Sequence, residues 1–404
     1  MNKRIIAAAA LVAGLLLQTQ GFTQVPITTS ASTVADAGKM SDPEKAARRT
    51  WAAVMKNIPV PGKGCFHVSY PNVAWESVEC KEAKPRVHHA SRRPAVLAPA
   101  YAGFGNDYIA GSTQGLIFEA HGHFFISGVT SETNYPNNDC EPPENCGILG
   151  QNDYSLQLNT NQAYTPACNG NGNCTVWQQF IYSTDSQQGG ALLGMQYWLL
   201  NFGNCPSGWQ HPSNEGGTPD TVDCYMNSQA VPTANIPVTD LGNVMLQGWA
   251  SPANGTDFND CVFLNYGDEW FSAVCAASVL DIGSVWTQAE FNVFGDLDSS
   301  QADFNPGSQI VVQLGIENGS NYPPVCLLGA PNNKPIAFPG QGTTGETNSL
   351  TLGTCQTGVG PVVTGPVSEF EPYIEFVEYQ PVPSIPCTTC GGGGGTPPPP
   401  PIKQ

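Results

Sequence analysis

The chain has 404 residues, with 15 Lys and Arg against 33 Asp and Glu, which gives a formal net charge of −18 at pH 7. Thirteen of the basic residues lie at or before Arg93, and the region after Arg93 has 2 basic against 27 acidic side chains. Such an acidic region cannot bind nucleic acid or an anionic membrane by charge.

The first 23 residues predict a secretory signal peptide. A basic start, Met1-Asn2-Lys3-Arg4, precedes an apolar run from Ile5 to Leu17 that is too short to span a bilayer. Cleavage is expected between Gly21 and Ala37. No later stretch is apolar enough to cross a membrane, so we expect a secreted, extracellular protein. We also expect it to be a monomer.

The 14 cysteines fit an oxidising compartment. They fall in near-neighbour pairs, each of which would close a local loop, although the spacing alone leaves the connectivity open. The pairs are Cys65/Cys80, Cys140/Cys146, Cys168/Cys174, Cys205/Cys224, Cys261/Cys275, Cys326/Cys355 and Cys387/Cys390. A zinc site is disfavoured because the Cys387-x-x-Cys390 motif has no second half.

Residues 24–93 form a basic leader. A start at Ser41-Asp42-Pro43-Glu44, followed by helical spacing of apolar residues up to Met55, predicts a helix. The leader ends at Ser91-Arg92-Arg93-Pro94, a site suited to cleavage. Two interpretations stay open: the leader neutralises an acidic, acid-active domain until it is removed, or the acidic surface serves solubility alone.

Residues 94–380 predict an all-β domain, because short alternating runs recur between Gly, Asn, Pro and Asp clusters. About a dozen strands with almost no helical pattern indicate a concanavalin-like or jelly-roll antiparallel β-sandwich. Tyr266-Gly267-Asp268-Glu269 predicts a hairpin. Residues 381–404, with five glycines and five prolines in succession, predict a disordered tail.

Several common catalytic motifs are missing from the sequence. It has no Gly-x-Ser-x-Gly, His-Glu-x-x-His or P-loop pattern, and no Lys or Arg from Pro94 to Asn333. His121-Gly122-His123 has the spacing of some metal sites but no clear third ligand. Asp296-Leu297-Asp298 resembles the start of a calcium loop but lacks the glycine and distal glutamate of an EF-hand, so a polar turn is favoured. We expect no cofactor and no metal.

Glu290 lies in the strand pattern that we regard as the centre of the domain. Ala289, Phe291 and Val293 would face the core, while Trp286, Gln288, Glu290, Asn292 and Phe294 would line the other face. A carboxylate in a polar, aromatic-flanked row suits an open substrate groove. The alternative is that Glu290 points into solvent, as most strand carboxylates do.

Two neighbouring glutamines, Gln178 and Gln179, lie in a second aromatic strand, Val176 to Tyr182. Because they face opposite sides, one of them must lie on the packed side or at its edge, where a buried amide needs hydrogen-bond partners. Met195-Gln196-Tyr197-Trp198 repeats the mixture of polar and aromatic residues.

These segments resemble the glutamic peptidases (eqolisins). Ala289-Glu290-Phe291-Asn292-Val293 followed by Ala302-Asp303-Phe304 is similar to the pattern around the catalytic glutamate of that family, and Cys174-Thr175-Val176-Trp177-Gln178 to its glutamine segment. The resemblance covers about residues 150–316. It implies a β-sandwich and a secreted acid endopeptidase, made as a zymogen, that acts on polypeptides.

The resemblance also implies roles for particular residues. Glu290 would be the general base that activates water, and the Gln178 amide would stabilise the oxyanion. Trp286, Tyr182, Tyr197 and Trp198 would line the substrate cleft. The chain departs from the family where Gln-Thr-Gly-Val-Asp has become Gln178-Gln179-Phe180-Ile181-Tyr182, which leaves the register between the two glutamines open.

Two other functions are compatible with the same residues. An aromatic groove on a β-sandwich could stack sugar rings, so a non-catalytic protein that binds polysaccharide or a cell surface is the main alternative. A disulfide-linked structural protein of the cell envelope is another.

Overall fold

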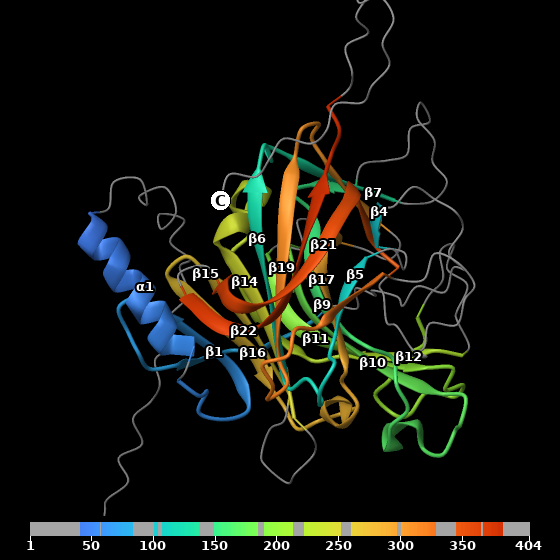
Figure 1. The fold of residues 1–404 in the computed structure, drawn as a ribbon. Coiled ribbons are helices and arrows are strands. Elements are labelled where there is room, and N and C mark those ends of the chain that lie inside the picture. Colours follow the sequence, from blue (N-terminus) through green and yellow to red (C-terminus); the bar gives the residue numbers. More distant parts are fainter. Residues whose placement is uncertain are drawn as a thin grey trace, which may run out of the picture.

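The computed structural model describes residues 41–56, 58–83, 101–103, 107–136, 149–184, 190–212, 222–251, 260–296, 300–328, 345–364 and 367–382. The predicted signal peptide, the Arg92-Arg93 join and most of the Gly- and Pro-rich tail lie outside these residues. Within them the protein is an antiparallel β-sandwich, as predicted (Figure 1).

The larger sheet has 13 strands. In spatial order they are β2 (Glu76–Val78), β1 (Gly64–Ser69), β16 (Glu269–Cys275), β15 (Asp260–Tyr266), β14 (Val244–Ala250), β6 (Glu119–Ser127), β19 (Gln309–Glu317), β22 (Val367–Tyr379), β21 (Thr347–Thr364), β18 (Ser300–Phe304), β7 (Glu132–Pro136) and β8 (Gly150–Gln151), with β4 (Tyr101–Gly103) paired to β21. Among these pairings, only that between β18 and β21 is parallel.

The smaller sheet has nine strands. In order they are β20 (Val325–Leu328), β5 (Tyr108–Gly111), β17 (Gln288–Gly295), β9 (Tyr154–Thr160), β10 (Thr175–Ser183), β11 (Leu192–Leu200), β13 (Gln229–Pro232) and β3 (Lys81–Glu82), with β12 (Cys224–Asn227) paired to β11. The helices in the described residues are α1 (Asp42–Lys56) and the short η1 (Pro166–Cys168), η2 (Val238–Asn243) and η3 (Ile282–Ser284).

The main core lies between the two sheets. Phe291 of β17 contacts Phe124 of β6, with ring centroids 4.7 Å apart. Glycines in the larger sheet make room for such rings: a Cβ on Gly122 would lie 1.9 Å from the Phe291 ring, and one on Gly248 would lie 2.5 Å from Phe180. The backbone therefore approaches the opposite sheet at these two positions more closely than any side chain would allow.

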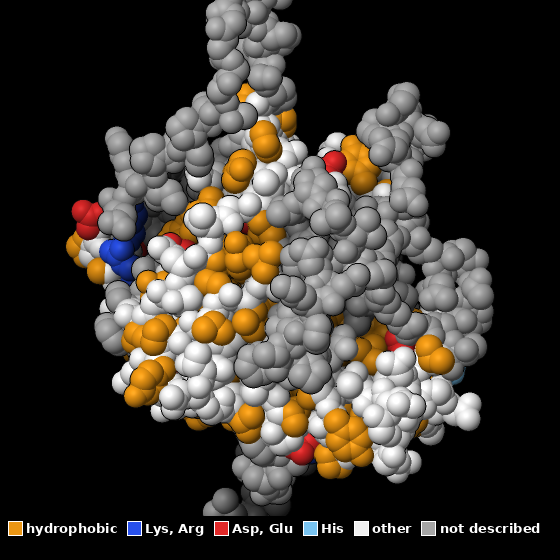
Figure 2. Space-filling model, turned by 45° about the vertical axis from the view of Figure 1, so that its right-hand side comes forward, with side chains coloured by type: hydrophobic (Ala, Val, Ile, Leu, Met, Phe, Trp, Pro, Cys, Tyr) orange, Lys and Arg blue, Asp and Glu red, His pale blue; other side chains and the backbone are white. Residues whose placement is uncertain are grey.

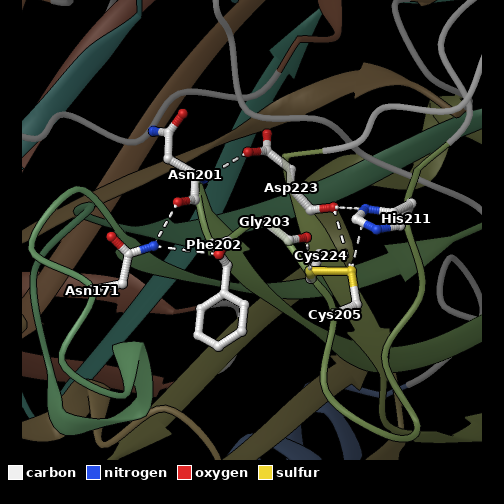
Figure 3. The surroundings of a disulfide bond; sticks show 8 residues. All are labelled: Asn171, Asn201, Phe202, Gly203, Cys205, His211, Asp223 and Cys224. Atoms are coloured by element: carbon white, nitrogen blue, oxygen red, sulfur yellow. Dashed lines mark hydrogen bonds between the residues drawn. A yellow bond between two sulfur atoms is a disulfide. The ribbon is translucent and has the colours of Figure 1, made fainter.

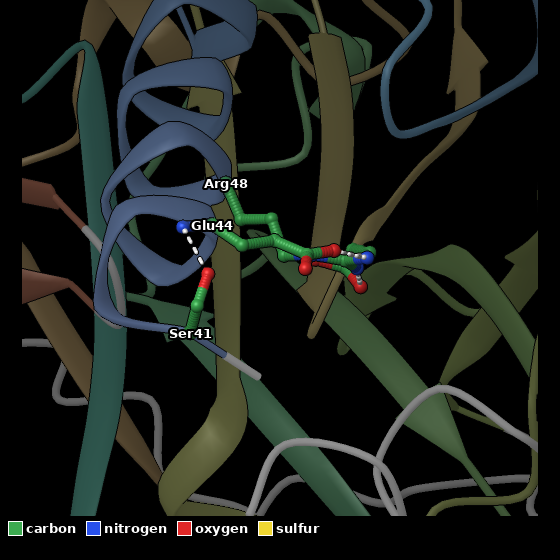
Figure 4. Close-up of polar contacts among 4 residues, drawn as sticks. Ser41, Glu44 and Arg48 are labelled. Atoms are coloured by element: carbon green, nitrogen blue, oxygen red, sulfur yellow. Dashed lines mark hydrogen bonds and ion pairs between the residues drawn. The ribbon is translucent and has the colours of Figure 1, made fainter. Parts of the chain in front are cut away.

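The predicted leader helix is present as α1. The Glu44 N–H donates to Ser41 Oγ at 3.4 Å, a weak N-terminal cap, and Arg48 pairs with Glu44 one turn later (Figure 4). Trp51 and Met55 are buried against residues of the larger sheet. Arg48 also contacts Asp268, the residue that precedes β16.

Part of the leader belongs to the sandwich rather than to a separate module. Strand β1 pairs with β16 in the larger sheet, and β3 pairs with β13 in the smaller one. The Cys65–Cys80 disulfide joins the two ends of this segment. Residues 64–82 thus complete one edge of each sheet. They are part of the β-sandwich, although they lie before the predicted domain boundary at residue 93.

Near-neighbour cysteine pairing is confirmed for five of the seven pairs. The disulfides are Cys65–Cys80, Cys168–Cys174, Cys205–Cys224, Cys261–Cys275 and Cys326–Cys355. The pairs Cys140/Cys146 and Cys387/Cys390 lie outside the described residues. The hairpin at Tyr266–Glu269 joins β15 to β16, with Gly267 at a φ of 57°. No helix in the described ranges has the length and apolar character that crossing a membrane requires.

Candidate functional site

Glu290 lies in the middle of β17 and is 1% exposed. The predicted alternation holds, because Ala289, Phe291 and Val293 are in the core between the sheets. Glu290 and Asn292 therefore point to the other face of the smaller sheet. The alternative that Glu290 points into solvent is wrong.

Five polar residues form one row across this face, and we call them the amide row. Residues that are paired across neighbouring strands point to the same side of a sheet. The paired residues, in order across β12, β11, β10, β9 and β17, are Asn227, Gln196, Gln179, Asn159 and Glu290. Four amides thus stand in line with one carboxylate.

A continuous hydrogen-bond network links this row. Asn159 Nδ2 donates to Glu290 Oε2 at 3.0 Å, and it also lies 3.5 Å from Gln157 Oε1. Gln179 Nε2 donates to the same Gln157 oxygen at 3.1 Å. Trp198 Nε1 lies 3.1 Å from Gln179 Oε1 and 3.0 Å from Gln196 Oε1. One oxygen of the carboxylate is therefore held by a neutral amide.

The structure does not bring Gln178 onto the face of Glu290. Its neighbour Gln179 is the residue in register with Asn159, so Gln178 points into the core between the sheets. Gln178 Nε2 lies 3.8 Å from Met195 Sδ. It also faces Asp260, where burial raises the pKa of the carboxyl to about 7 although hydrogen bonds from the Val279 backbone and Gln178 oppose the shift.

Only one of the four aromatic residues predicted to bind substrate shares the face of Glu290, namely Trp198. Trp286 packs in the core with Phe180, at a ring distance of 5.8 Å. Tyr182 is also in the core, where its hydroxyl donates to Ala234 O at 3.0 Å. Tyr197 is there as well, and burial raises its pKa well above the usual value.

A pair of buried carboxyls lies beside the amide row. Asn292, two residues after Glu290 on the same face, donates from Nδ2 to Asp107 Oδ2 at 3.0 Å and to Glu378 Oε1 at 2.7 Å. Burial raises the pKa of Asp107 to about 7, and burial together with the Asp107 charge raises that of Glu378 well above its usual range. At acid pH both groups are protonated, and each still has a carbonyl oxygen that can accept a hydrogen bond from Asn292 Nδ2.

Sequence reasoning missed several members of this site. Gln157 and Asn159 lie in Tyr154-Ser155-Leu156-Gln157-Leu158-Asn159, where polar and apolar residues alternate strictly. That alternation was a usable signal, because it places both amides on one face. Asp107 and Glu378 gave no comparable signal, since they come from opposite ends of the domain.

Metal-type ligands gather at one place in the described part of the chain. Cys205, His211 and Cys224 have ligand atoms within 4.8 Å of one another. The two sulfurs, however, form a disulfide, and His211 Nδ1 lies 2.8 Å from the carbonyl oxygen of Asp223 (Figure 3). Because a metal needs thiolates, this group in its oxidised form is a structural cross-link.

The His121-Gly122-His123 motif is divided between two contacts. His121 Nε2 lies 2.6 Å from Glu371 Oε1, whereas His123 Nδ1 lies 2.8 Å from Val244 O. Burial lowers the pKa of His123. The two imidazoles therefore make separate contacts, with different partners, on the outer face of the larger sheet.

The described part of the surface carries little positive charge. Figure 2 shows Lys and Arg side chains only at one edge of the visible face, and all Lys and Arg residues among those described belong to the 41–82 segment.

Comparison with models of known protein families and with curated proteins gives no match.

Proposed function

We propose that the protein is an acid endopeptidase of the glutamic type, with Glu290 as general base and Gln179 as oxyanion donor. The observation that supports this most is the hydrogen-bonded row that links a buried carboxylate to Gln179 through Asn159 and Gln157. Gln179 takes the place that the resemblance assigned to Gln178, because only Gln179 shares the face of Glu290.

The chemistry follows from the positions of the donors. Glu290 would take a proton from a water that attacks the scissile carbonyl and later deliver it to the leaving amine. The Gln179 amide has two N–H groups, of which one binds Gln157, so the second is free to stabilise the oxyanion. Strand β9 separates the two residues, so their backbones are two strand spacings, about 9.6 Å, apart, and in the active form the scissile carbonyl would bind between their side chains.

Asn159 would orient the base. Its Nδ2 holds one carboxylate oxygen of Glu290, which directs the other toward the water. Such a donor favours the ionised form, and an acid peptidase needs a carboxylate that stays ionised when most others are protonated. Asp107 and Glu378 would remain protonated in the same range and hold Asn292 in place.

The full chain would be the latent form. Glu290, Gln179 and Asn159 are each no more than 1% exposed, so a polypeptide has no access to them in this state. Cleavage within the basic leader is the step that we propose as the start of activation. In this interpretation the full chain is a zymogen, and the burial of Glu290, Gln179 and Asn159 is what keeps it inactive.

The test is hydrolysis of an unfolded protein from acid to neutral pH by the secreted product, before and after cleavage within its basic leader. The proposal expects cleavage at acid pH only after processing, and loss of cleavage in Glu290→Gln. Glu375→Gln, the same exchange at a half-buried residue of β22 in the larger sheet, is the matched control and should keep acid cleavage. If the processed, folded wild type cleaves nothing at any pH, the proposal is wrong.

Binding of polysaccharide is the second candidate. Trp177, Trp198 and Tyr225 form an aromatic row next to the amide row on the same face, with ring distances of 6.2 and 5.4 Å. Aromatic rings beside amides are a combination that recognises sugars. Retention of the processed protein on an insoluble glycan, unchanged by Glu290→Gln, would favour this function over hydrolysis.

A further inference from the structure

A second group of buried acidic residues lies at one end of the sandwich, away from the amide row. Glu132 and Asn134 are on β7, Asp153 directly precedes β9, and Asp296 directly follows β17. Because Gly295 pairs with Tyr154, the next residues along the two strands, Asp296 and Asp153, come to lie opposite each other. Like charges in such positions repel unless something neutralises them.

The hydrogen bonds inside this group leave oxygen atoms unused. The Asp153 N–H donates to Glu132 Oε2 at 2.9 Å, and Asn134 Nδ2 donates to Asp153 Oδ2 at 3.2 Å. Glu132 Oε1 and Asn134 Oδ1 have no hydrogen-bond partner among the described residues, although Glu132 is 2% and Asn134 0% exposed. Leaving such buried acceptors unsatisfied is costly, so they indicate a ligand.

Gly295 lets neighbouring oxygen atoms approach the backbone of β17 closely. A Cβ at this position would lie 2.3 Å from Ser300 Oγ and 2.7 Å from Asn134 Oδ1. Oxygen atoms of Asn134 on β7 and Ser300 on β18 are therefore packed against the end of β17, at a position where any residue but glycine would displace them.

The strands that carry this group contribute no cationic Lys or Arg side chain, because there is no Lys or Arg from Pro94 to Asn333. The possible ligands are carboxylate and amide oxygens, without nitrogen or sulfur. Oxygen donors of irregular arrangement suit calcium, which accepts six to eight ligands, better than zinc or magnesium.

We propose that Glu132, Asn134, Asp153 and Asp296 form a calcium site. No three of its acidic groups have ligand oxygens within 4.8 Å of one another, so the cation would draw them together. Calcium there would tie the ends of β9 and β17, the two strands that carry Asn159 and Glu290. The proposal does not depend on the peptidase function.

The test is calcium binding by the secreted full chain at neutral pH after treatment with EDTA. Equilibrium dialysis should give one calcium bound through this site, and the unfolding temperature should rise with the logarithm of the calcium concentration above the dissociation constant. Magnesium at equal ionic strength should give a much smaller rise. Absence of calcium binding would overturn the proposal.

Two variants locate the site. Glu132→Gln should weaken calcium affinity at least about tenfold, and Asp296→Asn serves the same purpose if the first variant fails to fold. Asp260→Asn, which removes a buried carboxyl elsewhere in the sandwich, should leave calcium affinity unchanged. Calcium binding of wild-type strength in both Glu132→Gln and Asp296→Asn would contradict the assignment.

Discussion

Asn159 Nδ2 donates a hydrogen bond to Glu290 Oε2 at 3.0 Å, from a residue directly paired with Glu290 on the neighbouring strand. Both residues are no more than 1% exposed. In a region that contains no Lys or Arg, a neutral amide therefore supplies a hydrogen bond to this buried carboxylate.

Asn159→Leu should reduce activity most at low pH. Without the amide donor the ionised carboxylate is less favoured, so the acid limb of the pH–activity profile should move to higher pH. The free energy of unfolding should also fall by about 1–3 kcal/mol, because a buried acceptor loses its partner. A profile of unchanged shape, with lower activity at every pH, would show that Asn159 does not act on Glu290.

The protein should be most stable in acid. Burial raises the pKa of Asp107 and Asp260 to about 7 and that of Glu378 well above its usual range, whereas ordinary carboxyls titrate near pH 4. The folded state thus binds more protons than the unfolded state between these values. The stabilisation is complete below about pH 4 and is lost as the pH rises through about 7, by about 1.4 kcal/mol per pH unit for each group.

Urea unfolding in EDTA from acid to neutral pH measures this dependence. The midpoint should fall as the pH rises, and Asp107→Asn should make the fall less steep because one of the titrating groups is removed. A midpoint that increases toward neutral pH would show that these carboxyls are ionised in the folded protein.

Gly122→Ala should destabilise the sandwich. The new Cβ would lie 1.9 Å from the ring of Phe291, so the two sheets would have to shift at their closest contact. We expect a loss of about 1–3 kcal/mol in the free energy of unfolding. Gly172→Ala, where a Cβ meets nothing within 4 Å, is the control and should be near neutral in the same thermal unfolding measurement.

The leader segment should stay bound after cleavage. Strand β1 pairs with β16, β3 pairs with β13, and Trp51 and Met55 are buried against the larger sheet. Release would expose both sheet edges and this apolar contact. After cleavage between residues 84 and 93, the two fragments should co-elute in size-exclusion chromatography and separate only in denaturant. Elution of the acidic domain alone would contradict this, and activation would then depend on release.

The strand positions and the orientation of Glu290 followed from the sequence because alternation in a half-polar strand is a local property. The choice between Gln178 and Gln179 did not. Their strand has Trp177 on one face and Phe180 on the other, so both faces look apolar, and only pairing with Asn159 identifies the residue that joins Glu290.

Trp286 shows a related limit. Its spacing from Glu290 put it on the same face, but β17 begins at Gln288, so the alternation does not extend back to Trp286, which turns into the core. The pairing of β1 with β16 and the meeting of Asp107 with Glu378 join residues far apart in the chain, and a single sequence carries no local pattern for such contacts.

The most direct measurement of the central claim compares Gln179→Ala with Gln178→Ala in the processed protein at its most active pH. If Gln179 stabilises the oxyanion beside Glu290, Gln179→Ala should lower kcat by about 100- to 1000-fold. Gln178→Ala should change stability but leave kcat within a few-fold of the wild type. Loss of kcat in Gln178→Ala with Gln179→Ala fully active would contradict the site described above.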